Sequence, residues 1–223
     1  MPKRKRNTKS HVAREAALIN AGMSVCQAAA TVVTGNMGFI GEAAHNLGDA
    51  ASFAAKDRAI HASNEEESRS RSLRLGAAGI FAAGGVFGVS AGSYELMSSS
   101  TETASPTAIG IAVACAGLNT IIAKRAHRSV HDTEMDETIS LCEHHTHSHY
   151  EKDPVARPER YEALLDTKIH ALSDAGTGWI YVSGLLAQAK GYGDHWSEFA
   201  VLVNGGIASL SASFTLRRIQ RKS

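Results

Sequence analysis

Hydrophobic and polar positions divide the chain into long uncharged stretches separated by charged segments. Asp, Glu, Lys, Arg and His are all absent from five stretches, at 16–41, 75–94, 103–123, 175–189 and 199–216. A transmembrane helix needs about 17–25 mostly apolar residues. Four of the stretches reach that length, and 175–189 reaches it when it is extended back to Leu164.

A sixth candidate helix lies at 40–60, where His45, Asp49 and Lys56 interrupt the apolar pattern. The competing interpretation is a soluble bundle with Ala-rich core helices, which the clustering of the charged residues disfavours. The pattern therefore predicts an all-α membrane protein with six transmembrane helices, at 14–34, 38–60, 74–94, 106–126, 161–189 and 197–217.

Six spans place the connections alternately on two sides of the membrane. Both termini and the connections at 61–73 and 127–160 fall on one side, and every Lys and Arg except Lys190 lies on or beside it. Basic residues next to transmembrane helices stay cytoplasmic, so both termini are predicted to be cytoplasmic. The expected organisation is a basic N-terminal tail at 1–13, a transmembrane domain at 14–217 that includes the cytoplasmic 127–160 loop, and a short basic tail at 218–223.

Composition narrows the function classes. The 223 residues carry 23 Lys and Arg against 22 Asp and Glu, a net charge of +1, which excludes a histone-like polycation. Three cysteines cannot form a fully paired disulfide framework. The basic run at 3–6 is explained by topology next to a first span, although such a run can also begin a cleaved signal peptide. The phosphate-binding motif G-x-x-x-x-G-K-S/T is absent from the sequence, and we expect neither an enzyme nor a nucleic-acid partner.

Four ionisable side chains repeat a His-x-x-x-Asp pattern inside predicted spans. His45 and Asp49 lie in the second span, and His170 and Asp174 lie in the fifth. Residues four apart share one helix face, and a carboxylate near the bilayer centre costs at least about 2.5–3.5 kcal/mol. Both pairs lie near the middle of their spans, so they can meet at one depth. Two imidazoles and two carboxylates suit tetrahedral Zn²⁺, although Co²⁺ and Fe²⁺ accept the same ligands. The alternative without metal is that each pair forms a local hydrogen bond or lines a proton path.

A histidine-rich segment lies in the predicted loop between the fourth and fifth spans. Short His tracts of this kind bind metal loosely, so we expect a collector or sensor there rather than the transport site. The alternative is a polar loop with incidental histidines. The auxiliary candidates are Cys142, His144, His145, His147 and His149.

Other polar and small residues are candidates for weaker roles. Glu42 precedes His45 by three residues and Asp166 precedes His170 by four, so both are candidates for vestibules on a metal path. Small residues every fourth position let two helices approach closely, within one chain or between two copies. They recur as Gly84, Gly88 and Gly92 in the third span and as Gly205, Ser209 and Ser213 in the sixth.

Two stretches of the sequence resemble signatures of the cation diffusion facilitator family of metal transporters. They are TGNMGFIGEAAHNLGDAAS at 34–52 and ALLDTKIHALSDAGTG at 163–178. The His-rich inner loop is also similar to that of many zinc-transporting members. We expect the protein to lack the family's usual cytoplasmic C-terminal domain.

This resemblance implies a fold, a site and an activity. His45, Asp49, His170 and Asp174 would be the ligands of an intramembrane transport site. Zn²⁺ would be the transported substrate, with Co²⁺ or Cd²⁺ as lesser substrates, exchanged for protons by a homodimer. Zinc needs neutral imidazole and ionised carboxylate, so protons compete with it and a proton gradient can drive its export.

The predicted function is therefore a Zn²⁺/H⁺ antiporter that removes metal from the cytoplasm. The second hypothesis is a membrane metal-binding sensor or accessory subunit that transports nothing itself. A third is a soluble bundle with a structural metal. The expected location is an integral, multi-pass position in a prokaryotic plasma membrane.

Overall fold

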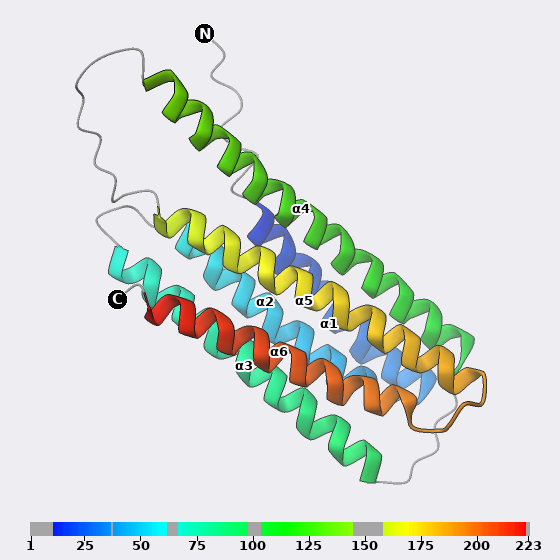
Figure 1. The fold of residues 1–223 in the computed structure, drawn as a ribbon. Helices are drawn as coiled ribbons and strands as arrows, with labels where there is room; N and C mark the ends of the chain where they lie inside the picture. Colours follow the sequence, from blue (N-terminus) through cyan, green and yellow to red (C-terminus); the bar gives the residue numbers. More distant parts are fainter. Residues whose placement is uncertain (1–10, 37, 62–66, 98–103, 145–157, 222–223) are drawn as a thin grey trace.

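The computed structural model is a bundle of helices that lie side by side (Figure 1). It describes residues 11–36, 38–61, 67–97, 104–144 and 158–221, and in this part of the chain no strand occurs. The helices are α1 (Val12–Thr34), α2 (Gly38–His61), α3 (Glu67–Met97), α4 (Pro106–His144), α5 (Pro158–Ala189) and α6 (Trp196–Gln220).

Each of the six predicted spans falls inside one of these helices, which confirms the helical segments. The ends differ where the sequence predicted a loop: α4 continues as helix through 127–144, and α5 already begins at Pro158. The helix does not stop where the apolar run stops, because the charged residues that follow, such as Arg128, Glu134 and Glu137, are good helix formers. The expected 127–160 loop is therefore helical over its first part.

Consecutive helices run in opposite directions, so the chain passes back and forth along the bundle (Figure 1). The starts of α1, α3 and α5 and the ends of α2, α4 and α6 all lie at the same end of the bundle. Among the described residues this end, called the basic end below, carries most of the Lys and Arg, and Lys190 lies at the opposite end. The charge asymmetry predicted from the sequence is thus a property of the folded bundle.

Four helices are long and apolar enough to cross a membrane, namely α1, α3, α4 and α6. Large apolar side chains also point outward from them, including Val32 at 86% exposure and Leu210 at 73%. Such a surface is unfavourable in water and favourable in lipid. The chain is an all-helical membrane protein.

The two remaining helices, α2 and α5, carry the polar residues of the predicted metal site. They are the two helices that are not apolar enough in composition to count among these candidate spans. Neighbours cover them instead: α2 packs between α1 and α3, α5 packs between α4 and α6, and α2 and α5 also contact each other. Their polar faces are therefore turned into the bundle, where Asp49, Asp166 and His170 are almost fully buried.

A close crossing of α3 and α6 uses small residues. A Cβ atom added at Gly88 would lie 3.2 Å from the Cα of Gly205, and one added at Gly85 would lie 2.5 Å from the Ser209 hydroxyl. The small-residue pattern of the sixth helix thus serves a contact within one chain. On α3 the predicted pattern is confirmed at Gly88 but not at Gly84, because Gly85 faces α6 while Gly84 faces His45 on α2.

Candidate metal centre

The two His-x-x-x-Asp pairs lie at the centres of antiparallel helices. His45 and Asp49 are near the middle of α2, and His170 and Asp174 are near the middle of α5. Four residues advance an α-helix by slightly more than one turn, so each His lies above its Asp on one face. Because α2 and α5 are in contact and run in opposite directions, equal depth along both helices brings the four side chains together.

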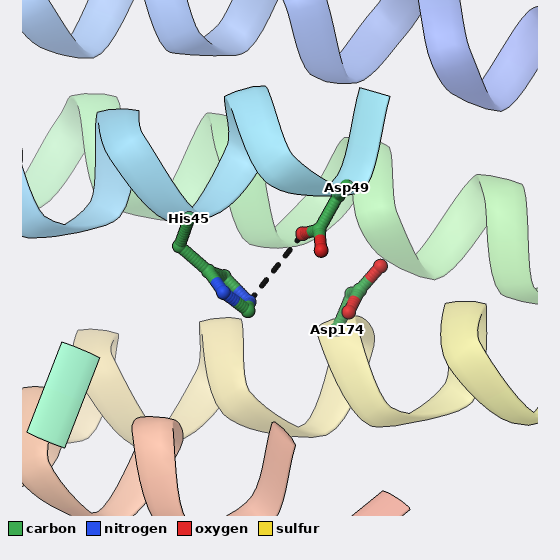
Figure 2. A group of neighbouring side chains, drawn as sticks. All are labelled: His45, Asp49 and Asp174. Atoms are coloured by element: carbon green, nitrogen blue, oxygen red, sulfur yellow. Dashed lines mark ion pairs between the residues drawn. The ribbon is translucent and has the colours of Figure 1, made fainter. Parts of the chain in front are cut away.

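Nitrogen and oxygen atoms of the four side chains lie close together, both within each helix and between the two helices. His170 Nε2 lies 2.9 Å from Asp49 Oδ1 and 3.5 Å from Asp174 Oδ2, and His45 Nε2 lies 3.4 Å from Asp49 Oδ2. Ligand atoms of His45, Asp49 and Asp174 all lie within 4.8 Å of one another. Figure 2 shows the Asp49 carboxylate on α2 facing the Asp174 carboxylate on α5, with the His45 imidazole beside them.

Several polar atoms of this cluster are buried without a hydrogen-bond partner among the described residues. They are His45 Nε2, Asp49 Oδ2 and both carboxylate oxygens of Asp174. A buried carboxylate without donors is strongly disfavoured, and two facing carboxylates repel each other. A cation between the two carboxylates could bind their unpaired oxygens and Nε2 of His45 at once. The cluster therefore has the donor set and the electrostatics of a site for a divalent metal ion.

The imidazole of His170 is held between aromatic rings. Its ring stacks on Phe53, with centroids 4.3 Å apart, and on Phe81, with centroids 3.6 Å apart. Its second nitrogen, Nδ1, contacts Ser52 Oγ at 3.3 Å and the Nζ atom of Lys56. These contacts orient the ring so that Nε2 points at the carboxylates.

Sequence reasoning treated Lys56 only as an interruption of an apolar run and did not single out Ser52, Phe53 or Phe81. A signal for three of them was present, because Ser52, Phe53 and Lys56 follow Asp49 by three, four and seven residues and so share its helix face. Phe81 belongs to α3, and only the tertiary structure places it against His170.

Two other acidic residues had been predicted to line vestibules. Glu42 is buried one turn from His45 and accepts a hydrogen bond from Asn204 Nδ2 of α6 at 3.3 Å. Asp166, one turn from His170 toward the basic end, is engaged in ion pairs with Arg74 and Arg218. The structure thus places both acids next to the candidate metal ligands, and the ion pairs of Asp166 also link α5 to α3 and α6.

The auxiliary candidates of the His-rich segment lie elsewhere. Cys142 and His144 belong to the last turn of α4, far along the chain from the cluster, and their side chains are outside the described part of the structure. His145, His147 and His149 lie outside the described residues.

Comparisons with known proteins matched no family model, no curated protein and no solved structure. What the structure itself defines is an all-helical membrane protein with a buried group, His45, Asp49 and Asp174, that could hold a metal ion.

Proposed function

We propose that the chain is a proton-coupled transporter that exports a divalent metal ion, with Zn²⁺ as the first candidate substrate, in the manner of the cation diffusion facilitator family. In this proposal all six helices cross the membrane and both termini are cytoplasmic. The basic end of the bundle then faces the cytoplasm, in agreement with the positive-inside rule. The prokaryotic plasma membrane and a homodimer are parts of the same hypothesis that rest on the sequence alone.

One observation carries the proposal: two acids and two imidazoles converge at mid-bundle from helices α2 and α5. Ionisable groups at this depth are costly unless they have a function. Asp49 and Asp174 face each other, and their oxygens include three atoms that lack a hydrogen-bond donor among the described residues. A purely structural role would require these atoms to be satisfied, and a transient cation would satisfy them.

The mechanism follows from competition between metal and protons. Metal binding needs neutral imidazoles and ionised carboxylates, so a site loaded from a neutral cytoplasm loses its metal when it is exposed to a more acidic exterior. Transporter sites at the membrane midplane are reached alternately from the two sides when one group of helices rocks against another. The contacts made by α2 and by α5 with different neighbours would allow such a motion between the two halves of the site.

The decisive experiment is zinc flux into proteoliposomes under an imposed pH gradient. Wild type is compared with Asp49→Ala, Asp174→Ala and the control Asp57→Ala, which removes a carboxylate of α2 eight residues away from Asp49. We expect gradient-dependent zinc movement in wild type and the control and its loss in the two site variants. Flux retained in both site variants would refute the site. Zinc binding without flux in any protein would favour the sensor or accessory-subunit hypothesis instead.

A further inference from the structure

The buried side chain of Lys56 has no place in the mechanism above. It is 3% exposed, and its Nζ lies 5.0 Å from the centroid of the Phe53 ring. A buried charged side chain is costly unless it is paired. Lys56 lies seven residues after Asp49, close to two helical turns, so it points from the same face of α2 toward α5.

Lys56 contacts the nitrogen of His170 that does not face the carboxylates. Its Nζ meets Nδ1, while Nε2 of the same ring lies 2.9 Å from Asp49 Oδ1. An ammonium group has three donors and no acceptor. When it donates to Nδ1, a neutral imidazole must carry its hydrogen on Nε2, where it donates to Asp49. A nitrogen that carries hydrogen cannot bind a metal, so this arrangement keeps His170 out of the ligand set.

Ser52 can offer Nδ1 of His170 a hydrogen-bond acceptor, whereas Lys56 offers it a donor. Its hydroxyl donates to the carbonyl oxygen of Ala77 at 3.0 Å, which uses its one hydrogen. Its oxygen, 3.3 Å from Nδ1, is left with lone pairs and can accept a hydrogen bond from Nδ1–H. In that tautomer Nε2 is free of hydrogen and its lone pair points at the carboxylates. Metal-binding histidines typically donate their second N–H in this way.

From this geometry we infer that Lys56 and Ser52 form a tautomer selector for His170. Lys56 holds the empty site in a form that cannot use His170 as a ligand, and Ser52 stabilises the form that can. The exchange moves one hydrogen from Nε2 to Nδ1, leaves the imidazole neutral and gains or loses no proton. The ammonium group only has to withdraw from Nδ1, and the carboxylates of Asp166, Asp174 and Asp49 all interact with it electrostatically. Lys56 is thus a positioning residue, and this role rests on the proposed function because it presupposes a metal at the cluster.

The inference predicts opposite effects for two substitutions on one helix. Lys56→Met removes the group that keeps the hydrogen of His170 on Nε2. A larger fraction of sites can then use His170 as a ligand, so zinc binds about 10-fold more tightly. In Ser52→Ala the hydrogen-bond acceptor is gone, so zinc binds about 10-fold to 100-fold more weakly. A merely structural role would weaken binding in both variants.

The matched control for charge is Lys168→Met. Lys168 is half-buried on α5, two residues before His170, and two residues rotate a helix by about 200°, so its side chain leaves on another face. Its removal changes the net charge by the same amount without touching Nδ1. We expect less than a twofold change in zinc affinity for this variant.

Zinc affinity is measured by isothermal titration calorimetry on the full chain in detergent, for wild type, the three variants and Asp49→Ala. Nitrogen-15 spectra of histidine-labelled protein report the tautomer, with the His170 signals assigned by their loss in His170→Gln. We expect hydrogen on Nε2 in metal-free wild type and a shift toward Nδ1 in Lys56→Met. Equal gains in Lys56→Met and Lys168→Met, or hydrogen on Nδ1 in metal-free wild type, would overturn the inference while leaving the metal site intact. Absence of tight zinc binding in wild type would refute the proposed function itself.

Discussion

The ion-pair cluster at the basic end gives a stability prediction whose size follows from burial. Asp166 accepts from Arg74 Nε at 2.7 Å and from Arg218 Nη2 at 2.5 Å, and Glu162 Oε2 lies 2.8 Å from Arg218 Nη2. The side chains of Asp166 and Arg74 are only 1% and 2% exposed. The cluster therefore ties α5 to both α3 and α6 with charges that water does not screen.

Replacing Asp166 with Ala removes the shared acid. The guanidinium of Arg74 also lies 3.7 Å from Glu162 Oε2, but it loses its charge-assisted hydrogen bond to Asp166. Breaking a buried pair in this way costs about 3–5 kcal/mol. With a shift of about 2–4 °C per kcal/mol for a chain of this size, the melting temperature should fall by about 6–20 °C.

The control is the exposed pair between Glu15 of α1 and Arg125 of α4, whose side chains are 47% and 57% exposed. Because water screens such a pair, Glu15→Ala should cost about 0–1 kcal/mol. Thermal unfolding of the purified protein in detergent, followed by circular dichroism, measures both variants. A double variant, Arg74→Met with Asp166→Leu, should recover part of the loss, because it leaves the Glu162–Arg218 pair intact and no unpaired charge at either site.

Equal shifts for Asp166→Ala and Glu15→Ala would refute the reasoning, since burial would then not determine the strength of the pair. The single variants Arg74→Met and Asp166→Leu complete the comparison. A double variant destabilised by at least the sum of these two would refute the reasoning as well, because the two charges would then act independently or through other contacts.

Three further predictions concern the metal and the helix crossing. Zinc affinity should fall as the pH is lowered, because protons compete with the metal for the imidazoles of His45 and His170 and for the carboxylates of Asp49 and Asp174. Calorimetry in buffers of different ionisation enthalpy should show protons released on binding, and pH-independent binding would contradict the ligand set. Gly88→Leu should destabilise the α3–α6 crossing by about 1–3 kcal/mol, because a Cβ there meets the Gly205 backbone, whereas Gly76→Leu on the same helix has open space and should be near neutral in a melting experiment. Replacing the His and Cys residues of 142–149 with Ser should remove loosely bound zinc, measured by equilibrium dialysis, and leave gradient-driven flux in place; loss of flux would show that this segment is required for transport.

Much of the fold could be predicted from the sequence because membrane-spanning helices have a distinctive composition. Uncharged runs of bilayer length mark where helices form, and helical periodicity shows that His45 shares a face with Asp49 and His170 with Asp174. Matching depth in two such helices was enough to predict that the pairs meet, and the structure brings these four side chains together.

Only the tertiary structure decided how the helices are rotated and which of them are neighbours. Periodicity gives each helix a polar face but does not say what that face touches, so the stacking of Phe81 on His170 could not be read from the chain. The same limit explains why Gly85 rather than Gly84 faces α6, and why Asp166 pairs with arginines of two other helices. One residue turns a helix by about 100°, and close backbone approach together with buried ion pairs selects among such rotations. Local sequence therefore determined which residues are available to the site, and packing determined which of them act on one another.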